Sequence, residues 1–145
     1  MKNKLFIVGF FSLLNHAQIF DSNNLIPTVD ESFVLSAKYE SKYIEVDFQL
    51  MPDTYIYLDK INVKDINDSK IYFELNGNKK EKDDLFFGLS EIFDSEFKIK
   101  FYPRYEKKIL LNFQGCYKNK VCYPNKIKNI YIKYDKKSIS SVKIE

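Results

Sequence analysis

Apolar and polar residues alternate with a period of two in several segments of this chain. The alternation is clearest in residues 44–50, where every second residue is apolar and the residues between them are charged or carry an amide. Residues 33–39, 97–101 and 109–113 follow the same pattern. Successive side chains of a β-strand point to opposite faces of a sheet, so this period predicts strands with one buried face.

Shorter apolar runs predict further strands. They occupy residues 55–58, 61–63, 71–75 and 130–134. Residues 51–54 predict a turn, because Pro and Asp interrupt a strand and favour reversal. Asn76-Gly77 predicts a second turn directly after the strand over 71–75. The charged run over 79–84 and the lysine- and serine-rich end of the chain show no strand pattern.

These segments amount to about seven or eight short strands with turn signals at intervals of about ten to fifteen residues. No long helical periodicity is present outside the N-terminal segment. Aromatic residues make up 17% of the 145 residues, which favours strands over helices. We therefore predict an all-β protein, an immunoglobulin-like β-sandwich that forms one domain over residues 18–145.

Residues 1–17 have the pattern of a secretory signal peptide. Two lysines stand near the start, residues 5–14 form an apolar run, and Ala17 offers a small residue for cleavage. The run is shorter than the roughly 20 residues that span a bilayer. A buried N-terminal strand is the alternative interpretation. We expect an exported protein with a net charge of about +1 after cleavage.

Charge and histidine content exclude several functions. The chain has 23 basic and 20 acidic residues, which gives no reason to expect nucleic acid as a partner. Its only histidine, His16, lies inside the predicted signal peptide. A mature chain without histidine has no Ser-His-Asp or Cys-His triad and no histidine-ligated metal site, so we expect no bound metal.

Cys116 and Cys122 are the only two cysteines, and two interpretations of them remain open. One is a structural disulfide, as is common in exported domains. Closing so short a loop stabilises a chain by only about 2–2.5 kcal/mol in the chain-entropy model. The other is a dithiol that exchanges disulfides, which requires an accessible sulfur and a pair close enough to bridge. The polar linker 117–120 between the cysteines makes exposure plausible, and its two lysines would favour a thiolate weakly.

Three segments together resemble the N-terminal periplasmic domain of DsbD, the transmembrane thiol:disulfide reductase family. Residues 113–124, Phe-Gln-Gly-Cys followed by Cys-Tyr-Pro, are similar to its redox motif. Residues 53–61 resemble its Tyr-x-Tyr strand, and residues 84–93 its cap loop and the following strand. The three segments occur in the same order as in the family and fall within residues 27–134. The family fold is an immunoglobulin-like sandwich, in agreement with the strand pattern.

The resemblance implies a role for each cysteine. Cys122 corresponds to the cysteine that forms a mixed disulfide with a partner, and Cys116 to the one that resolves it. The further site residues implied are the cap-loop and lining residues Phe86, Phe87, Asp84, Tyr55 and Tyr57. Phe86 corresponds to the aromatic residue that covers the disulfide until a partner displaces it. The aromatic residues could instead be ordinary packing residues, and the acid part of a solvated loop.

The implied function is that of a protein-disulfide reductase with no cofactor besides the Cys116–Cys122 disulfide. It would be a periplasmic monomer that passes reducing equivalents to thioredoxin-fold proteins, such as a disulfide isomerase or a cytochrome c maturation reductase. A thioredoxin-like or membrane protein would be the electron donor. The alternative is a non-enzymatic β-sandwich binding module with a structural disulfide.

Two departures from the family pattern affect these expectations. Leu85 stands where the family often has a second acid, so control of the thiol pKa would depend on Asp84 alone. The chain ends at Glu145, whereas in DsbD a membrane domain and a thioredoxin-like domain follow and supply electrons. We expect either a stand-alone relative reduced by a separate protein or a fragment of a longer reductase. Separately, Asn67-Asp68-Ser69 forms an Asn-x-Ser glycosylation sequon with an acid at Asp65.

Overall fold

The computed structural model of the chain describes residues 25–145, which form thirteen β-strands, one short α-helix and one 3-10 turn. The predicted signal peptide, residues 1–17, lies outside the described residues. The strands are β1 (Phe33–Glu40), β2 (Tyr43–Leu50), β3 (Thr54–Tyr57), β4 (Asn62–Asp65), β5 (Phe73–Gly77), β6 (Lys80–Asp84), β7 (Gly88–Phe93), β8 (Phe97–Phe101), β9 (Lys108–Phe113), β10 (Gly115–Tyr117), β11 (Val121–Cys122), β12 (Lys126–Asp135) and β13 (Ser138–Ile144). The α-helix, α1, is Val29–Ser32, and the 3-10 turn is Leu58–Lys60.

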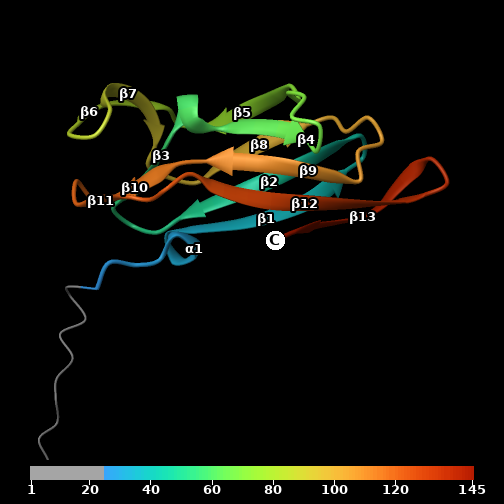
Figure 1. Ribbon diagram of the computed structural model, residues 1–145, viewed down its shortest axis with the longest axis horizontal. Helices are drawn as coiled ribbons and strands as arrows, with labels where there is room; N and C mark the ends of the chain where they lie inside the picture. Colours follow the sequence, from blue (N-terminus) through green and yellow to red (C-terminus); the bar gives the residue numbers. More distant parts are fainter. Residues whose placement is uncertain (1–24) are drawn as a thin grey trace, which may run out of the picture.

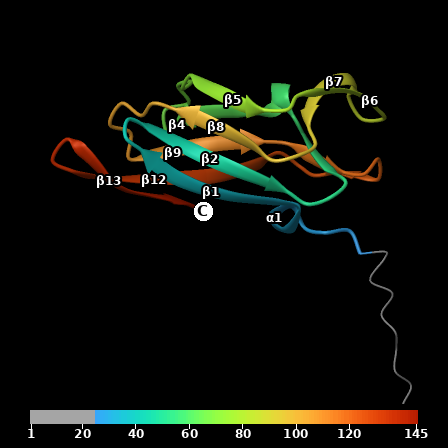
Figure 2. The ribbon, with the colours of Figure 1, turned by 180° about the vertical axis from the view of Figure 1, so that it is seen from behind.

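Two antiparallel sheets face each other and form the body of a sandwich. One has the strand order β1-β2-β8-β5 and the other β13-β12-β9-β4 (Figures 1 and 2). A third sheet, β11-β10-β3-β7-β6, continues the sandwich at one end, where β9 leads into β10 (Figure 1). This architecture confirms the predicted all-β, immunoglobulin-like β-sandwich.

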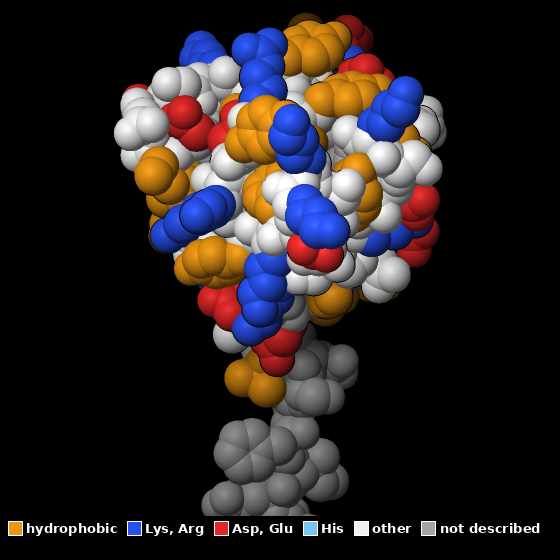
Figure 3. All heavy atoms as spheres, turned by 90° about the vertical axis from the view of Figure 1, so that its right-hand side faces the viewer, with side chains coloured by type: hydrophobic (Ala, Val, Ile, Leu, Met, Phe, Trp, Pro, Cys, Tyr) orange, Lys and Arg blue, Asp and Glu red, His pale blue; other side chains and the backbone are white. Residues whose placement is uncertain are grey.

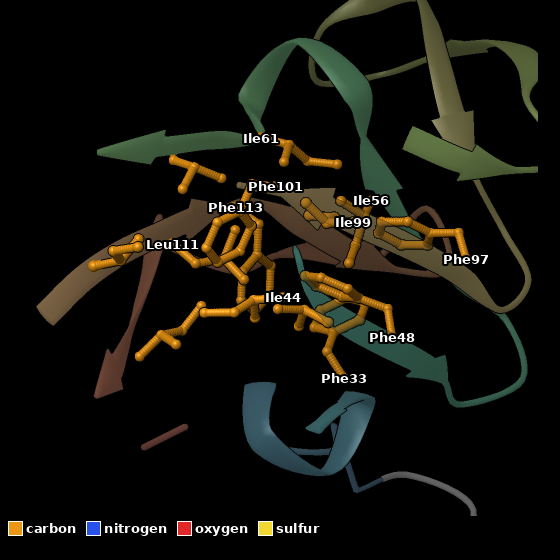
Figure 4. Close-up of a cluster of buried hydrophobic side chains, with 14 of the residues drawn as sticks. Phe33, Ile44, Phe48, Ile56, Ile61, Phe97, Ile99, Phe101, Leu111 and Phe113 are labelled. Atoms are coloured by element: carbon orange, nitrogen blue, oxygen red, sulfur yellow. The ribbon is translucent and has the colours of Figure 1, made fainter. Parts of the chain in front are cut away.

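The core lies between the two facing sheets and is built from the alternating apolar residues (Figure 4). Ile44, Val46 and Phe48 of β2 are at most 1% exposed, as the period of two predicts. Phe48 stacks on Phe97 of β8 with ring centroids 4.4 Å apart. Burying each such side chain contributes about 1.5–3 kcal/mol. The core therefore contributes more burial free energy than the roughly 2–2.5 kcal/mol expected from so short a disulfide loop.

The strand prediction was wrong in three places. The charged run forms the edge strand β6, in which only Asp84 is buried, and the C-terminal residues form the edge strand β13. Edge strands with solvated faces do not need an apolar pattern. Asn76-Gly77 is part of β5 and forms no turn. A Cβ atom at Gly77 would lie 2.5 Å from the Cβ of Phe97, so this glycine permits close packing instead of chain reversal.

Strand β3 connects the core with a second buried cluster. All four of its residues are buried. Ile56 points into the sandwich core, whereas Tyr55 and Tyr57 point to the other face and pack with Ile92 and Cys116. The Tyr-Ile-Tyr sequence thus places two aromatic hydroxyls beside the cysteines. None of the helices in residues 25–145 is long and apolar enough to cross a membrane.

Candidate functional site

The two cysteines lie opposite each other on the antiparallel strands β10 and β11 and form a disulfide. Their Cα atoms are 4.0 Å apart. The amide of Tyr123 donates a hydrogen bond to the carbonyl oxygen of Gly115 at 2.9 Å, so Cys116 and Cys122 occupy a non-hydrogen-bonded pair, the closer kind in an antiparallel ladder. This register confirms that the pair is close enough to bridge.

The two cysteines differ in exposure to solvent. Cys116 is fully buried between β3 and β11, whereas Cys122 is only half-buried. Strand β11 is the outermost strand of its sheet (Figure 1). Residues of a non-hydrogen-bonded pair direct their backbone N–H and C=O groups away from each other's strand. Cys122 therefore presents its own backbone groups at the open edge of the sheet.

Gly115 explains how Cys116 can lie so close to the core. A Cβ atom at this position would lie 2.5 Å from the Phe33 ring and 2.5 Å from the carbonyl oxygen of Tyr55. No other residue fits without displacing one of them. The sequence analysis did not assign this glycine a role, although its place in alternation with the core residue Phe113 is a usable signal.

Tyr57 joins the disulfide to Asp84. Its hydroxyl donates a hydrogen bond to the Asp84 carboxylate and lies 3.2 Å from the Sγ of Cys116 and 3.7 Å from the Sγ of Cys122. Burial, together with this hydrogen bond to a carboxylate, raises the pKa of Tyr57 far above its ordinary value. The phenol therefore stays protonated and can act as a hydrogen-bond donor at any physiological pH.

Tyr55 differs from Tyr57 although the two rings pack edge to face at 5.5 Å. Within residues 25–145, the buried Tyr55 hydroxyl has no hydrogen-bond partner. Burial raises the pKa of Tyr55 above its ordinary value. The ammonium group of Lys82 lies 4.9 Å from the centre of the Tyr55 ring, an interaction that the sequence analysis missed.

Asp84 fixes the loop between β6 and β7, residues 85–87, which we call the cap loop. Its Oδ1 atom accepts hydrogen bonds from the backbone amides of Phe86 and Phe87 at 2.9 and 2.8 Å. Burial raises the pKa of Asp84, but the hydrogen bonds from Tyr57 and these two amides outweigh that effect, so the net pKa lies below its ordinary value. Asp84 is therefore a buried carboxylate and not part of a solvated loop.

The cap-loop aromatic residues make different contacts. The Phe87 ring packs edge to face on Tyr57, with centroids 4.8 Å apart, and the Lys60 ammonium lies 5.0 Å from its centre. Phe86 and Phe87 are each 43% exposed and Leu85 is 83% exposed, so the two phenylalanines differ in their contacts and not in their exposure. The packing of the loop against the site therefore comes from Phe87, and the covering role expected for Phe86 stays a prediction.

Lys118, one of the two lysines between β10 and β11, contacts an acid and an aromatic ring, and no contact of its ammonium group with a cysteine is present within residues 25–145. The ammonium of Lys118 lies 3.7 Å from the Asp53 carboxylate and 5.1 Å from the centre of the Tyr117 ring. Its charge is therefore partly compensated by an acid. No group of three or more His, Cys, Asp or Glu residues in the described part of the chain is arranged to hold a metal ion.

The sequence matches the family described as "Thiol:disulfide interchange protein DsbD, N-terminal" over residues 23–132. It is 31% identical over 122 residues to the thiol:disulfide interchange protein DsbD of Neisseria meningitidis serogroup A, and 25% identical over 116 residues to that of Colwellia psychrerythraea. The matched parts are 79% and 77% of this chain. The chain spans only about a fifth of the length of these curated relatives, 20% and 19%.

Two solved structures share the fold. The reduced DsbD N-terminal domain of N. meningitidis superimposes with a TM-score of 0.68 at 23% identity, over 86% of this chain and 98% of that domain. A second structure, of the complex between the DsbD N-terminal and PilB N-terminal domains of the same organism, gives a TM-score of 0.56 at 26% identity, over 74% of this chain and 86% of the matched chain.

Proposed function

This chain belongs to the family of DsbD N-terminal domains, and on that premise we propose that it is a periplasmic thiol–disulfide exchange protein acting as a protein-disulfide reductase. It passes reducing equivalents to thioredoxin-fold proteins, such as a disulfide isomerase or a cytochrome c maturation reductase. A thioredoxin-like or membrane protein reduces it again. The observation that carries the proposal is the Cys116–Cys122 bridge, with one fully buried and one half-buried cysteine beside a buried Tyr57–Asp84 pair.

The exchange proceeds in two substitutions at sulfur. The thiolate of reduced Cys122 attacks one sulfur of the partner's disulfide, a mixed disulfide forms, and the partner's second sulfur leaves as a thiolate. Cys116 then loses its proton and attacks the Sγ of Cys122. The Cys116–Cys122 bond forms, and the partner's first sulfur leaves. Two electrons have then passed to the partner, whose two sulfurs take up protons.

Tyr57 and Asp84 act on these steps in opposite directions. The Tyr57 hydroxyl lies 3.2 Å from the Cys116 sulfur and 3.7 Å from the Cys122 sulfur, so its single proton can turn from Asp84 to a sulfur that carries negative charge only by giving up the bond to Asp84. The Asp84 carboxylate, which this same hydroxyl contacts, places a negative charge near the pair and disfavours a second one. We therefore expect the thiols to stay protonated until a partner approaches, which limits exchange with unrelated disulfides.

The cap loop limits access in a second way. Asp84 holds the backbone of Phe86 and Phe87 by two hydrogen bonds, and Phe87 packs on Tyr57. In our proposal, Phe86 and Phe87 shield the sulfurs and Tyr55 and Tyr57 form the wall behind them. A partner must displace the loop before it reaches Cys122.

The backbone of Cys122 provides the docking contact for that partner. Its N–H and C=O groups face the open edge of the sheet, where an extended segment can add as a further strand. The reactive sulfur stands on the same residue. Backbone pairing would thus hold the partner's cysteine beside Cys122 whatever the partner's side chains are.

A trapping experiment tests the proposal. The Cys116→Ala protein should accumulate mixed disulfides through Cys122 with a few periplasmic proteins, visible on non-reducing gels and identified by mass spectrometry. Cys122→Ala is the matched control and should form none. If Cys116→Ala gave only indiscriminate adducts and lost stability, the pair would be a structural disulfide in a binding module.

A further inference from the structure

The turn between β4 and β5 carries the sequence Asp65-Ile66-Asn67-Asp68-Ser69, which the exchange function does not explain. We propose that Asn67 is an N-linked glycosylation site, modified by an oligosaccharyltransferase that uses a polyprenyl-diphosphate-linked oligosaccharide. The proposal rests on the export of the chain that is part of the proposed function, but it does not depend on disulfide exchange.

Asp65 organises this turn through its own hydrogen bonds. Its backbone carbonyl accepts the amide of Asp68 at 3.2 Å, and its Oδ1 atom accepts the amides of Asn67 and Ser69, both at 2.8 Å. Asp68 takes a positive φ of 65° and pairs with Lys64. Asp65 and Asp68 are therefore explained by turn formation, since aspartate commonly caps turns and tolerates this conformation.

The two groups that define a glycosylation sequon, the side-chain amide of Asn67 and the hydroxyl of Ser69, are not needed to form the turn. Within residues 25–145, neither the side-chain amide of Asn67 nor the hydroxyl of Ser69 forms a hydrogen bond; the hydrogen bonds of these two residues are made by their backbone groups. Both residues are exposed. The sequon amide and hydroxyl are therefore free for a transferase, which must reach the nitrogen and recognise the hydroxyl.

The turn can enter an enzyme active site without unfolding the sandwich. Residues 63–65 are paired with 109–111 of β9, but the other hydrogen bonds and the ion pair of the turn join residues within the segment 63–71. Residues 66–70 are all exposed. Local opening of such a segment costs far less free energy than global unfolding. The folded protein is thus a suitable acceptor.

The position of the turn keeps a glycan away from the exchange site. The β4–β5 turn lies at the end of the sandwich opposite β10 and β11 (Figure 1). Figure 3 looks onto this far end, where hydrophobic and basic side chains are interspersed on the surface. A cavity of about 450 Å³ beside the turn is lined by Ser69, Tyr72 and Tyr102, among others. These two tyrosines are 79% and 46% exposed and offer flat apolar faces to the first sugar.

The reaction is a substitution at the anomeric carbon of the donor. The Nδ2 atom of Asn67 forms a bond to that carbon, the bond from the carbon to the diphosphate oxygen breaks, and the polyprenyl diphosphate leaves. The amide gives up one proton to the released diphosphate or to water and stays neutral. No oxidant or reductant is involved.

Intact-mass measurement of the protein purified from the periplasm of its own cells tests the proposal. We expect a mass increase of one oligosaccharide, located at Asn67 by peptide fragmentation. Ser69→Thr, which keeps the hydroxyl, should retain the modification, whereas Ser69→Ala and Asn67→Gln should abolish it.

The unmodified mass in periplasmic protein would overturn the proposal, and so would a glycan that persists in Ser69→Ala. Recovery of the protein only from the cytoplasm would overturn both the glycosylation and the proposed location. Trapping of exchange partners by Cys116→Ala is independent of Asn67, so failure of one proposal is distinguishable from failure of the other.

Discussion

Tyr57→Phe should destabilise the oxidised protein, whereas Tyr55→Phe should not. Both tyrosines are buried on the same face of β3, and each substitution removes only a hydroxyl. The hydroxyl of Tyr57 donates to the Asp84 carboxylate, and that of Tyr55 has no partner within the described residues. The pair therefore separates the effect of one hydrogen bond from the effect of ring packing.

The size of the difference follows from these contacts. A hydrogen bond to a charged group contributes about 1.5–3 kcal/mol to the free energy of unfolding. Asp84 is only 8% exposed but keeps two backbone donors, so we expect the lower part of this range, about 2 kcal/mol, for Tyr57→Phe. Tyr55→Phe removes an unsatisfied buried hydroxyl and should change stability by about 0 to +1 kcal/mol. The unfolding constants of the two variants should thus differ by about 30-fold or more.

The loss of stability caused by Tyr57→Phe, measured against the unsubstituted protein, should depend on pH. The folded-state pKa of Asp84 is below its ordinary value, so the stability that this carboxylate contributes is present above the unfolded-state pKa and is lost as the pH falls through the folded-state pKa. Without the Tyr57 hydroxyl, the folded-state pKa moves up toward the unfolded value. The stability of the Tyr57→Phe variant should therefore fall less steeply in acid than that of the unsubstituted protein. The stability curves of these two proteins should converge at acid pH.

Urea unfolding of the oxidised proteins, followed by circular dichroism between neutral and acid pH, measures both effects. Asp84→Asn in each background completes a double-mutant cycle, and we expect the coupling energy to fall on Tyr57 and not on Tyr55. Equal stabilities of the two phenylalanine variants at neutral pH would refute this account of the site. A difference that stays constant as Asp84 titrates would refute the assignment of the effect to its carboxylate.

One labelling experiment and two substitutions test other parts of the site. In the reduced protein, Cys122 should be alkylated by iodoacetamide before Cys116, because Cys116 is fully buried and Cys122 only half-buried; peptide mapping of a quenched time course would contradict this if Cys116 reacted first. Gly115→Ala should lower the free energy of unfolding by about 1–3 kcal/mol, because the added methyl group meets a ring and a carbonyl oxygen at 2.5 Å; unchanged stability in urea would contradict the packing. Asp84→Ala should release the cap loop and speed reduction of the disulfide by small thiols several-fold; an unchanged reduction rate would show that the loop does not limit access.

The sequence predicted the core strands well because their burial pattern has a direct sequence signature. Residues 44–50, 97–101 and 109–113 alternate as one-sided strands must, and the structure buries the apolar set of each. Strands β6 and β13 were missed because both are edge strands that contribute little to the core. The pattern of apolar residues cannot reveal a strand held mainly by backbone hydrogen bonds.

The candidate site likewise has features that the sequence predicted and features that it did not. The resemblance placed both cysteines, the tyrosines, Asp84 and the cap loop in one region, and the structure brings them together around β3 and β10. Three features have no local signature in the sequence. They are the contact of Tyr57 with both sulfurs, the Tyr55 hydroxyl without a partner among residues 25–145, and the position of Lys82 over the Tyr55 ring. Each depends on the pairing of strands far apart in the chain.

The most direct test of the exchange function is the identity of the sulfur that carries the intermediate. Reduced protein is mixed with an oxidised thioredoxin-fold domain, quenched with acid at successive times and analysed by intact mass and peptide mapping. We expect a transient mixed disulfide through Cys122 alone, followed by the oxidised Cys116–Cys122 protein and the reduced partner in equal amounts. A mixed disulfide through Cys116, or a partner that stays oxidised beside the reduced protein, would contradict the proposed function.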